Sequence, residues 1–130
     1  MNMQPAQTSC LVLIAENEGL IGLDLQEELE GAGYEVAGPF STCTDAVQWL
    51  KRNTPDIAVV DIHLRDGACV ELARELTKLQ VPIAVYSGER QSAMRPEFKE
   101  AKWIEKPADA STLLAAVAGL RLPSQSRTLS

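Results

Sequence analysis

The sequence has 130 residues, of which 45% are hydrophobic and 23% charged, and its 18 acidic against 12 basic residues give a formal net charge of −6. This length fits one domain, which can bury about two-thirds of its unfolded surface without a disulfide or a structural metal. The excess of acidic residues argues against binding to nucleic acid, which depends on Lys and Arg neutralising phosphates. It favours a cation as the bound ligand.

The chain opens on a polar stretch, residues 1–9, which we expect to form a disordered tail. Cys10 to Ala15, CLVLIA, is a continuous apolar run of the kind that forms a buried strand. A helix pattern follows, with apolar residues repeating at i, i+4 and i+8 at Ile21, Leu25 and Leu29. Gly31 and Gly33 stop this helix, because glycine readily adopts the backbone conformation that ends a helix.

A shorter second strand alternates in YEVAG and ends at Gly38 and Pro39. Thr42 followed by Asp45 looks like a capping box, with Asp in the place of Glu, and begins a second helix. Pro55 blocks this helix from continuing.

The third strand is the apolar run from Ile57 to Val60, which predicts a strand buried on both faces and ends abruptly in Asp61. We expect the third helix over Gly67 to Gln80, with Asp66 and Gly67 as the turn and cap that begin it. Its apolar residues have the spacing of an amphipathic helix at Leu72, Leu76 and Leu79.

The fourth strand is PIAVYSG, which ends in Ser87 and Gly88, and the short fifth strand is AKWIEKP, which closes with Lys106 and Pro107. Between them, GERQSAMRPEFKE lacks an apolar period and contains a proline, so we expect a short or irregular fourth helix. Asp109 can cap a final helix. This helix carries Leu113, Val117 and Leu120.

This alternation predicts an α/β fold, a doubly wound five-stranded parallel sheet with helices on both faces, flavodoxin-like with strand order 2-1-3-4-5. The domain covers residues 10–121 and is followed by a flexible tail, residues 122–130. That tail is too short for a DNA-binding or catalytic output domain, so we expect the protein to act alone by docking onto partners.

Ligands of such sheets bind beyond the carboxyl ends of the strands, so the residues after each strand define a site. Glu16 and Asp61 follow two of the strands, and two carboxylates about 4 Å apart repel by roughly 4 kcal/mol unless a proton or a cation joins them. An oxygen-rich site of this kind suits Mg²⁺. Lys106 and Ser87 would complete a cradle for a phosphoryl group, with Asp61 as the candidate nucleophile.

The stretches LVLIAENE, DIAVVDIHLRDG, IAVYSG and IEKP, in this order, resemble the receiver domain of two-component response regulators. The resemblance implies that Asp61 accepts a phosphoryl group from a sensor histidine kinase or phosphotransfer protein, and that a protein partner reads the resulting surface change. It implies Mg²⁺ held by Glu16, Asn17, Asp61 and the backbone carbonyl of His63. It also implies phosphoryl contacts from Ser87, Gly88 and Lys106, a switch aromatic at Trp103, and Pro107 in a peptide bond often found cis.

Two departures from the family pattern change what we expect. Asn17 stands where the family normally has aspartate, which predicts weaker Mg²⁺ binding because a full charge is replaced by a dipole. Compensation by Glu18 is disfavoured, because its side chain should start from the following helix. The irregular fourth helix belongs to the face that often dimerises in the family, so the usual homodimer cannot be assumed.

Simpler interpretations stand beside these. Trp103 can be strand packing with no switching role, and the ring of His63 can be a plain loop side chain. A degenerate receiver that binds a partner without phosphorylation is an alternative, with Asn17 as its support. A flavin- or nucleotide-binding protein is disfavoured, since no Gly-rich phosphate loop is present.

The remaining features point to a cytoplasmic protein. Three cysteines, Cys10, Cys43 and Cys69, lack a C-x-x-C spacing and are expected to be packing thiols in a reducing compartment. No secretory signal or membrane span is predicted, and we expect neither membrane nor nucleic-acid partners. The chain is not expected to be an enzyme, although self-hydrolysis of an acyl phosphate would follow from the family.

Overall fold

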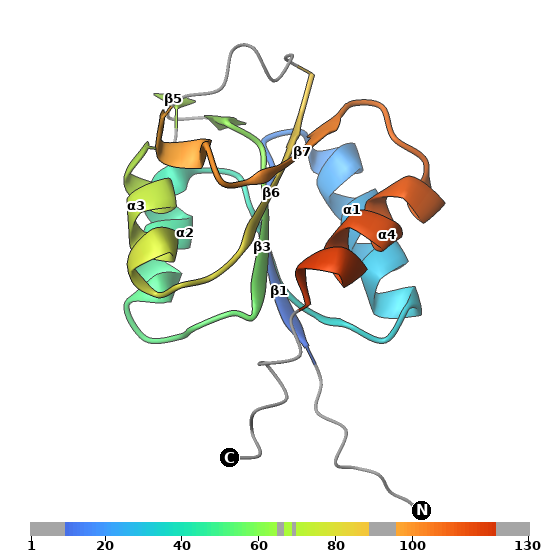
Figure 1. Ribbon diagram of the computed structural model, residues 1–130, viewed down its shortest axis with the longest axis horizontal. Coiled ribbons are helices and arrows are strands. Elements are labelled where there is room, and N and C mark those ends of the chain that lie inside the picture. Colours follow the sequence, from blue (N-terminus) through green and yellow to red (C-terminus); the bar gives the residue numbers. More distant parts are fainter. Residues whose placement is uncertain (1–9, 65–66, 69, 89–95, 122–130) are drawn as a thin grey trace, which may run out of the picture.

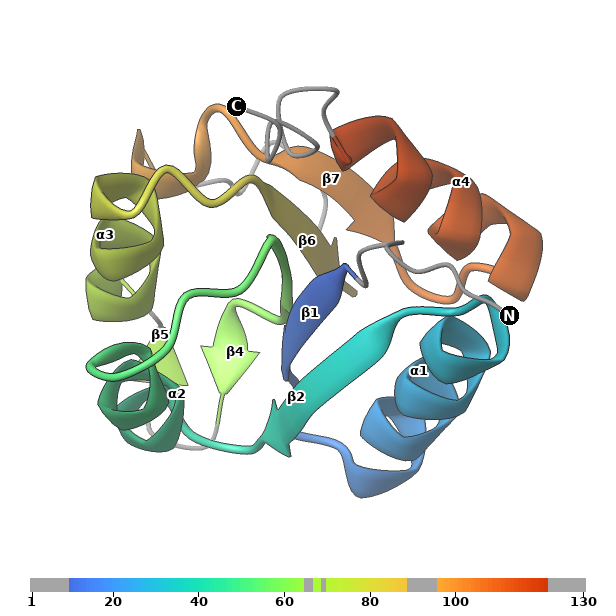
Figure 2. The same ribbon diagram turned by 90° about the horizontal axis from the view of Figure 1, so that it is seen from below.

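The computed structural model describes residues 10–64, 67–68, 70–88 and 96–121, which form a central parallel sheet with helices on both faces (Figures 1 and 2). The sheet strands are β1 (Leu11–Ala15), β2 (Glu35–Phe40), β3 (Ile57–Val60), β6 (Ile83–Ser87) and β7 (Lys102–Glu105). The helices are α1 (Gly19–Gly31), α2 (Cys43–Leu50), α3 (Val70–Lys78) and α4 (Ala110–Leu120), with a short 3₁₀ helix, η2 (Pro96–Phe98). Both predicted tails lie outside the described residues.

The sheet order is β2-β1-β3-β6-β7, and every neighbouring pair is parallel. Counting only these five strands, this is the predicted order 2-1-3-4-5, so the flavodoxin-like fold is confirmed. The chain reverses its direction across the sheet between β1 and β3, which are neighbours. The carboxyl ends of β1 and β3 therefore flank the switch point where ligands of such sheets bind.

Helices α2 and α3 cover one face of the sheet, and α1 and α4 cover the other (Figure 2). The pleat sends alternate residues of β1 to opposite faces, with Leu13 under α2 and α3 and Ile14 under α1 and α4. All four residues of β3 are buried, as its unbroken apolar run predicts. None of the described helices is long and apolar enough to cross a membrane.

Several predicted ends of helices are confirmed. The Thr42 side chain accepts a hydrogen bond from the Asp45 N–H at 3.0 Å and caps α2. Asp109 caps α4 by accepting from the Thr112 N–H at 2.9 Å. Helix α1 ends at the predicted glycines, and Gly33 has a positive φ of +98°.

The predicted start of the third helix is wrong. Gly67–Ala68 forms a two-residue strand, β5, which pairs antiparallel with β4 (His63–Leu64), and α3 begins only at Val70. Leu79 lies beyond the end of α3 and is exposed, whereas Leu72 and Leu76 are buried. Asp66 lies outside the described residues.

The predicted end of the second strand at Gly38 and Pro39 is also wrong, because β2 continues to Phe40. Leu13 pairs with Ala37 but Ala15 pairs with Phe40, so β2 carries one extra residue opposite β1. This is a β-bulge, and a bulge on an edge strand is a place where proline is tolerated.

In the described residues of the connection from β6 to β7, 88 and 96–101, the only helical element is the short 3₁₀ helix η2, which agrees with the predicted short or irregular helix. Its Phe98 is fully buried with the α2 and α3 core. The Cys10 and Cys43 side chains are buried in the two cores, which agrees with a packing role, and Cys69 lies outside the described residues.

Candidate functional site

Four of the predicted site residues meet at one edge of the sheet. Glu16 follows β1, Asp61 follows β3, Ser87 ends β6 and Lys106 follows β7. The backbone joins these strand ends, since the Asp61 N–H donates to the Ala15 carbonyl at 2.8 Å and the Lys106 N–H to the Ser87 carbonyl at 2.9 Å. In the described part of the chain, the buried polar or charged residues are Glu16, Asp61 and Ser87, at 3%, 7% and 1% exposure.

Lys106 bridges the two carboxylates. Its Nζ lies 3.0 Å from Asp61 Oδ2 and 3.1 Å from Glu16 Oε1, and it donates hydrogen bonds to Asp61 Oδ2 and to Glu16 Oε2. The same amine lies 5.5 Å from the centre of the Tyr86 ring, which adds a cation–π contact. The ammonium is therefore directed into the site and is not a plain surface amine.

Backbone N–H groups orient both carboxylates. The Glu18 N–H donates to Glu16 Oε2 at 3.0 Å, and the His63 N–H donates to Asp61 Oδ1 at 3.0 Å. Each donor lies two residues beyond the acid that it holds, Glu18 just before α1 and His63 at the start of β4. No signal in the sequence could have predicted these contacts, because any residue except proline offers a backbone N–H.

The charges of the site are unbalanced. Burial raises the pKa of the Glu16 carboxyl, and the charge of Asp61 raises it further, against the opposing effects of the Glu18 N–H and Lys106. Burial alone would lower the pKa of Lys106, but its hydrogen bonds and charge contacts with Asp61 and Glu16 outweigh burial and raise it. With two acids ionised and one amine protonated, the group carries an excess negative charge that a cation can neutralise.

One observation fits a metal ion here. Glu16 Oε1 is buried and accepts no hydrogen bond within the described structure, although it lies 3.1 Å from Lys106 Nζ. This oxygen has only its ion pair with Lys106 to offset burial, and carboxylate oxygens are ligands that Mg²⁺ prefers. Over the described residues, no three His, Cys, Asp or Glu side chains gather in a metal-binding arrangement. Further ligands beside Glu16 and Asp61 would be the Asn17 amide, the His63 carbonyl and water.

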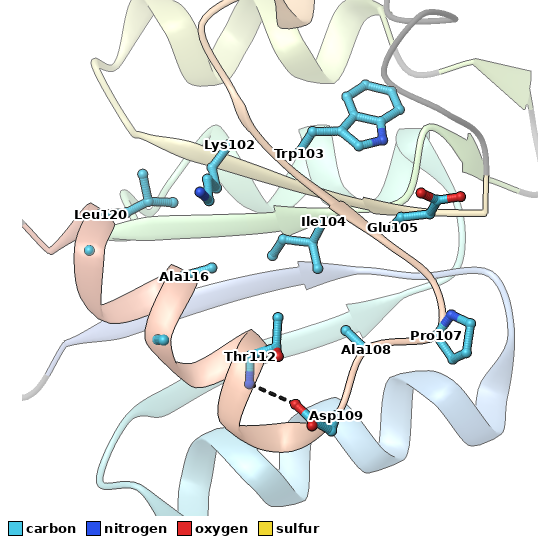
Figure 3. Close-up of a pocket in the computed structure, with 12 residues that line it drawn as sticks. Lys102, Trp103, Ile104, Glu105, Pro107, Ala108, Asp109, Thr112, Ala116 and Leu120 are labelled. Atoms are coloured by element: carbon cyan, nitrogen blue, oxygen red, sulfur yellow. Dashed lines mark hydrogen bonds between the residues drawn. The ribbon is translucent and has the colours of Figure 1, made fainter.

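The other predicted site residues lie around this group. Asn17 is half-buried next to Glu16, while His63 and Gly88 are exposed at the ends of their strands. The Lys106–Pro107 peptide bond is cis. Trp103 is half-buried and packs against the core under α2 and α3, and Figure 3 shows its ring on the side of β7 away from α4.

A cavity of about 860 Å³ lies between β7 and α4, outside the acidic site (Figure 3). Ile104 and Ala116 line it, with Asp109 and Thr112 at one end and Leu120 at the other. The four converging residues of the site are not among those that line it. The chemistry therefore lies on the strand ends and not in this cavity.

A doubly wound sheet with two buried carboxylates and a bridging lysine at its switch point defines a receiver-type signalling domain. The family model of the response regulator receiver domain matches residues 12–118 of this chain. The chain belongs to this family, which confirms the resemblance.

The relatives of this chain differ in how much of their own length the match covers. The chain is 32% identical over 112 residues to the transcriptional regulatory protein PdtaR of Mycobacterium tuberculosis, which covers 82% of this chain but 54% of PdtaR. It is 31% identical over 111 residues to the chemotaxis protein CheY of Thermotoga maritima, covering 82% of this chain and 92% of CheY. The chain thus spans about half the length of PdtaR and nearly all of CheY.

A solved structure supports the same assignment. The solution structure of the PhyR receiver domain of Erythrobacter litoralis has a TM-score of 0.77 to this fold and 26% sequence identity, and the match covers 89% of this chain and 92% of that domain.

Replacing Glu16 with Gln is expected to raise the free energy of unfolding of the metal-free protein at about pH 7 by about 1 kcal/mol. Because burial raises the pKa of Glu16, the folded state holds its proton more tightly than the unfolded state does. The contribution of Glu16 to stability therefore falls as the pH rises above 4.5, the unperturbed pKa, and is unaffected below it. Urea unfolding with EDTA over a pH series measures this. A gain of the same size at about pH 3 and about pH 7 would contradict it.

Proposed function

We propose that this chain is a single-domain response regulator in which Asp61 accepts a phosphoryl group from a sensor histidine kinase or phosphotransfer protein. The observation that carries the proposal is the shared ammonium of Lys106, which lies 3.0 Å from Asp61 and 3.1 Å from Glu16 in one buried site. Such an arrangement keeps Asp61 available as a nucleophile and places positive charge beside it.

The reaction forms a bond between an Asp61 carboxylate oxygen and phosphorus while the phosphorus–nitrogen bond of the donor phosphohistidine breaks. The electron pair of the broken bond stays on the imidazole nitrogen. Lys106 neutralises charge on the phosphoryl oxygens, and Ser87 and the Gly88 backbone offer hydrogen bonds. Bound Mg²⁺, held by Glu16, Asn17, Asp61 and the His63 carbonyl, would supply the remaining positive charge.

Phosphorylation changes the partners of Lys106 and so alters the surface that a protein partner reads. One carboxylate oxygen of Asp61 becomes bonded to phosphorus, so Lys106 no longer bridges two free carboxylates. Ser87 pairs with Glu105, and Val85 with Trp103, along the β6 and β7 ladder. A shift at Ser87 would reach Trp103 through this ladder. In this proposal the chain is a signalling module, in line with the regulatory and chemotaxis names of its relatives.

Acetyl phosphate and Mg²⁺ test the proposal. The wild-type protein is expected to gain one phosphoryl group by intact mass, and Asp61→Ala is expected to gain none. Asp24→Ala, which removes an exposed carboxylate on α1, is the matched control and should be modified like the wild type. An adduct that survives in Asp61→Ala, or a wild-type protein without an adduct, would refute the proposal.

A second candidate is a degenerate receiver that binds a partner without phosphorylation. Asn17 favours it, together with the lack of three clustered acids among the described residues. A partner affinity that Asp61→Ala leaves unchanged would support this candidate over the first.

A further inference from the structure

A glycine inside helix α1 packs against the bulge of β2. Gly22 is buried, and a Cβ added there would lie 3.0 Å from Pro39 Cβ and 3.1 Å from Pro39 Cγ. The same Cβ would lie 3.6 Å from Cγ of Glu16. A glycine within a helix is destabilising relative to alanine. Its place in α1 is therefore explained by the space that Pro39 occupies.

Pro39 has little freedom to move away from α1. Gly38, just before it, has a φ of +103°, and a Cβ at Gly38 would lie 2.6 Å from the Ile14 carbonyl oxygen. The backbone of β2 therefore lies directly against β1 at this point. The bulge is fixed on one side by β1 and on the other by α1.

The residue after the bulge holds the main chain of Glu16. The Phe40 carbonyl accepts a hydrogen bond from the Glu16 N–H at 2.9 Å. Because the bulge adds a residue, Phe40 pairs with Ala15 and its ring joins the α2 and α3 side, where it lies 6.1 Å from the Trp49 ring. Without the bulge, Phe40 would be shifted by one residue relative to β1. Its ring would face α1, and its carbonyl would no longer lie opposite the Glu16 N–H.

We propose that Gly22 and Pro39 are positioning residues for Glu16, and that their contact sets where this carboxylate stands in the metal site. The inference rests on the proposed function, because it gives Glu16 the role of metal ligand. A side chain at position 22 would have to push either Pro39 or the start of α1, because its Cβ would lie 3.0 Å from Pro39 Cβ, whereas 3.6 Å to Glu16 Cγ is an ordinary contact. The first route reaches Glu16 through Phe40, whose carbonyl accepts from the Glu16 N–H. The second route also reaches Glu16, since the Glu18 N–H at the start of α1 holds Glu16 Oε2 at 3.0 Å.

Titrating Mg²⁺ alone into the unphosphorylated protein, by calorimetry, tests the inference. Gly22→Ala is expected to weaken Mg²⁺ binding about tenfold, the usual size of an effect on residues that orient metal ligands. Gly119→Ala makes the same change in α4, where an added Cβ meets nothing within 4 Å, and should leave Mg²⁺ binding unchanged. Urea unfolding of each variant confirms that the titrated protein is folded.

Removing the atoms that the added methyl group would meet separates positioning from loss of structure. In a Pro39→Gly background, Gly22→Ala is expected to change Mg²⁺ affinity less than about threefold, because the contact no longer exists. If Gly22→Ala does not fold, Pro39→Gly tests the inference by itself. This variant removes side-chain atoms and so creates no overlap, and it is expected to weaken Mg²⁺ binding.

Two results would overturn the inference and leave the proposed function standing. One is a Gly22→Ala protein with wild-type Mg²⁺ affinity that is still phosphorylated on Asp61. The other is a Pro39→Gly protein with wild-type affinity. A wild-type protein that binds no Mg²⁺ and gains no phosphoryl group would overturn the proposed function and this inference with it.

Discussion

Lys106→Met is expected to slow the modification of Asp61 by acetyl phosphate at least about 100-fold at saturating Mg²⁺, the usual effect of removing a charge-stabilising group from a reacting site. Methionine keeps much of the side-chain length but removes the ammonium that lies 3.0 Å from Asp61 and 3.1 Å from Glu16. The loss leaves the phosphoryl oxygens without the charge of Lys106 and the two acids without a shared partner. The rate of adduct formation, followed by intact mass, measures the effect.

Lys102→Met is the matched control, because Lys102 is an exposed lysine on β7, the strand that Lys106 follows. It should be modified at the wild-type rate. Lys106→Arg should recover only part of the rate, since the planar guanidinium of arginine cannot take the place of a compact ammonium between two carboxylates. A Lys106→Met rate within about threefold of the wild type would contradict the role given to this amine.

The strands and the convergence of the site could be predicted from apolar runs, because the carboxyl ends of parallel strands meet at one edge of the sheet. CLVLIA and the run from Ile57 to Val60 are strands by pattern alone, and their carboxyl ends must lie together in a parallel sheet. The acid that follows each run, Glu16 or Asp61, is therefore placed without knowledge of any contact. Lys106 follows from the same rule.

The features that the sequence did not predict are backbone interactions: the pairing of β4 with β5 and the N–H groups that hold the two carboxylates. His63 pairs with Ala68 and Leu64 with Gly67 in a hairpin of two-residue strands, too short to show any alternation. The glycine at position 67 resembles a helix cap in the sequence, although it belongs to a strand. The N–H groups of Glu18 and His63, which hold the two carboxylates, could belong to almost any residue type.

The bulge in β2 is another feature that the local sequence pattern did not predict. Gly38 and Pro39 are turn-forming residues, and their pattern indicates the end of a strand. On an edge strand the same pair is compatible with a bulge, and here Pro39 packs closely beside Gly22 on α1. That contact joins residues from different elements, so a local pattern does not reveal it. Its consequence reaches the site, because Phe40, after the bulge, holds Glu16.

Asn17→Asp is expected to tighten Mg²⁺ binding about tenfold or more and to lower the free energy of unfolding of the metal-free protein. Asn17 is half-buried beside Glu16, where an added carboxylate would turn an ion–dipole attraction into an ion–ion one. Without metal, the same carboxylate would add to the repulsion between Glu16 and Asp61, whose charge already raises the pKa of Glu16. Calorimetric titration with Mg²⁺ and urea unfolding in EDTA measure the two effects.

The opposite signs of these two effects distinguish a site effect from a general change in charge. Gln48→Glu makes the same exchange of amide for carboxylate on the exposed side of α2 and should alter neither quantity beyond a small shift. Glu18→Gln tests whether the exposed Glu18 side chain already supplies the missing charge, in which case it should weaken Mg²⁺ binding. Equal Mg²⁺ affinities for Asn17→Asp and the wild type would show that the amide oxygen is not a limiting ligand, and that Glu16 and Asp61 set the affinity.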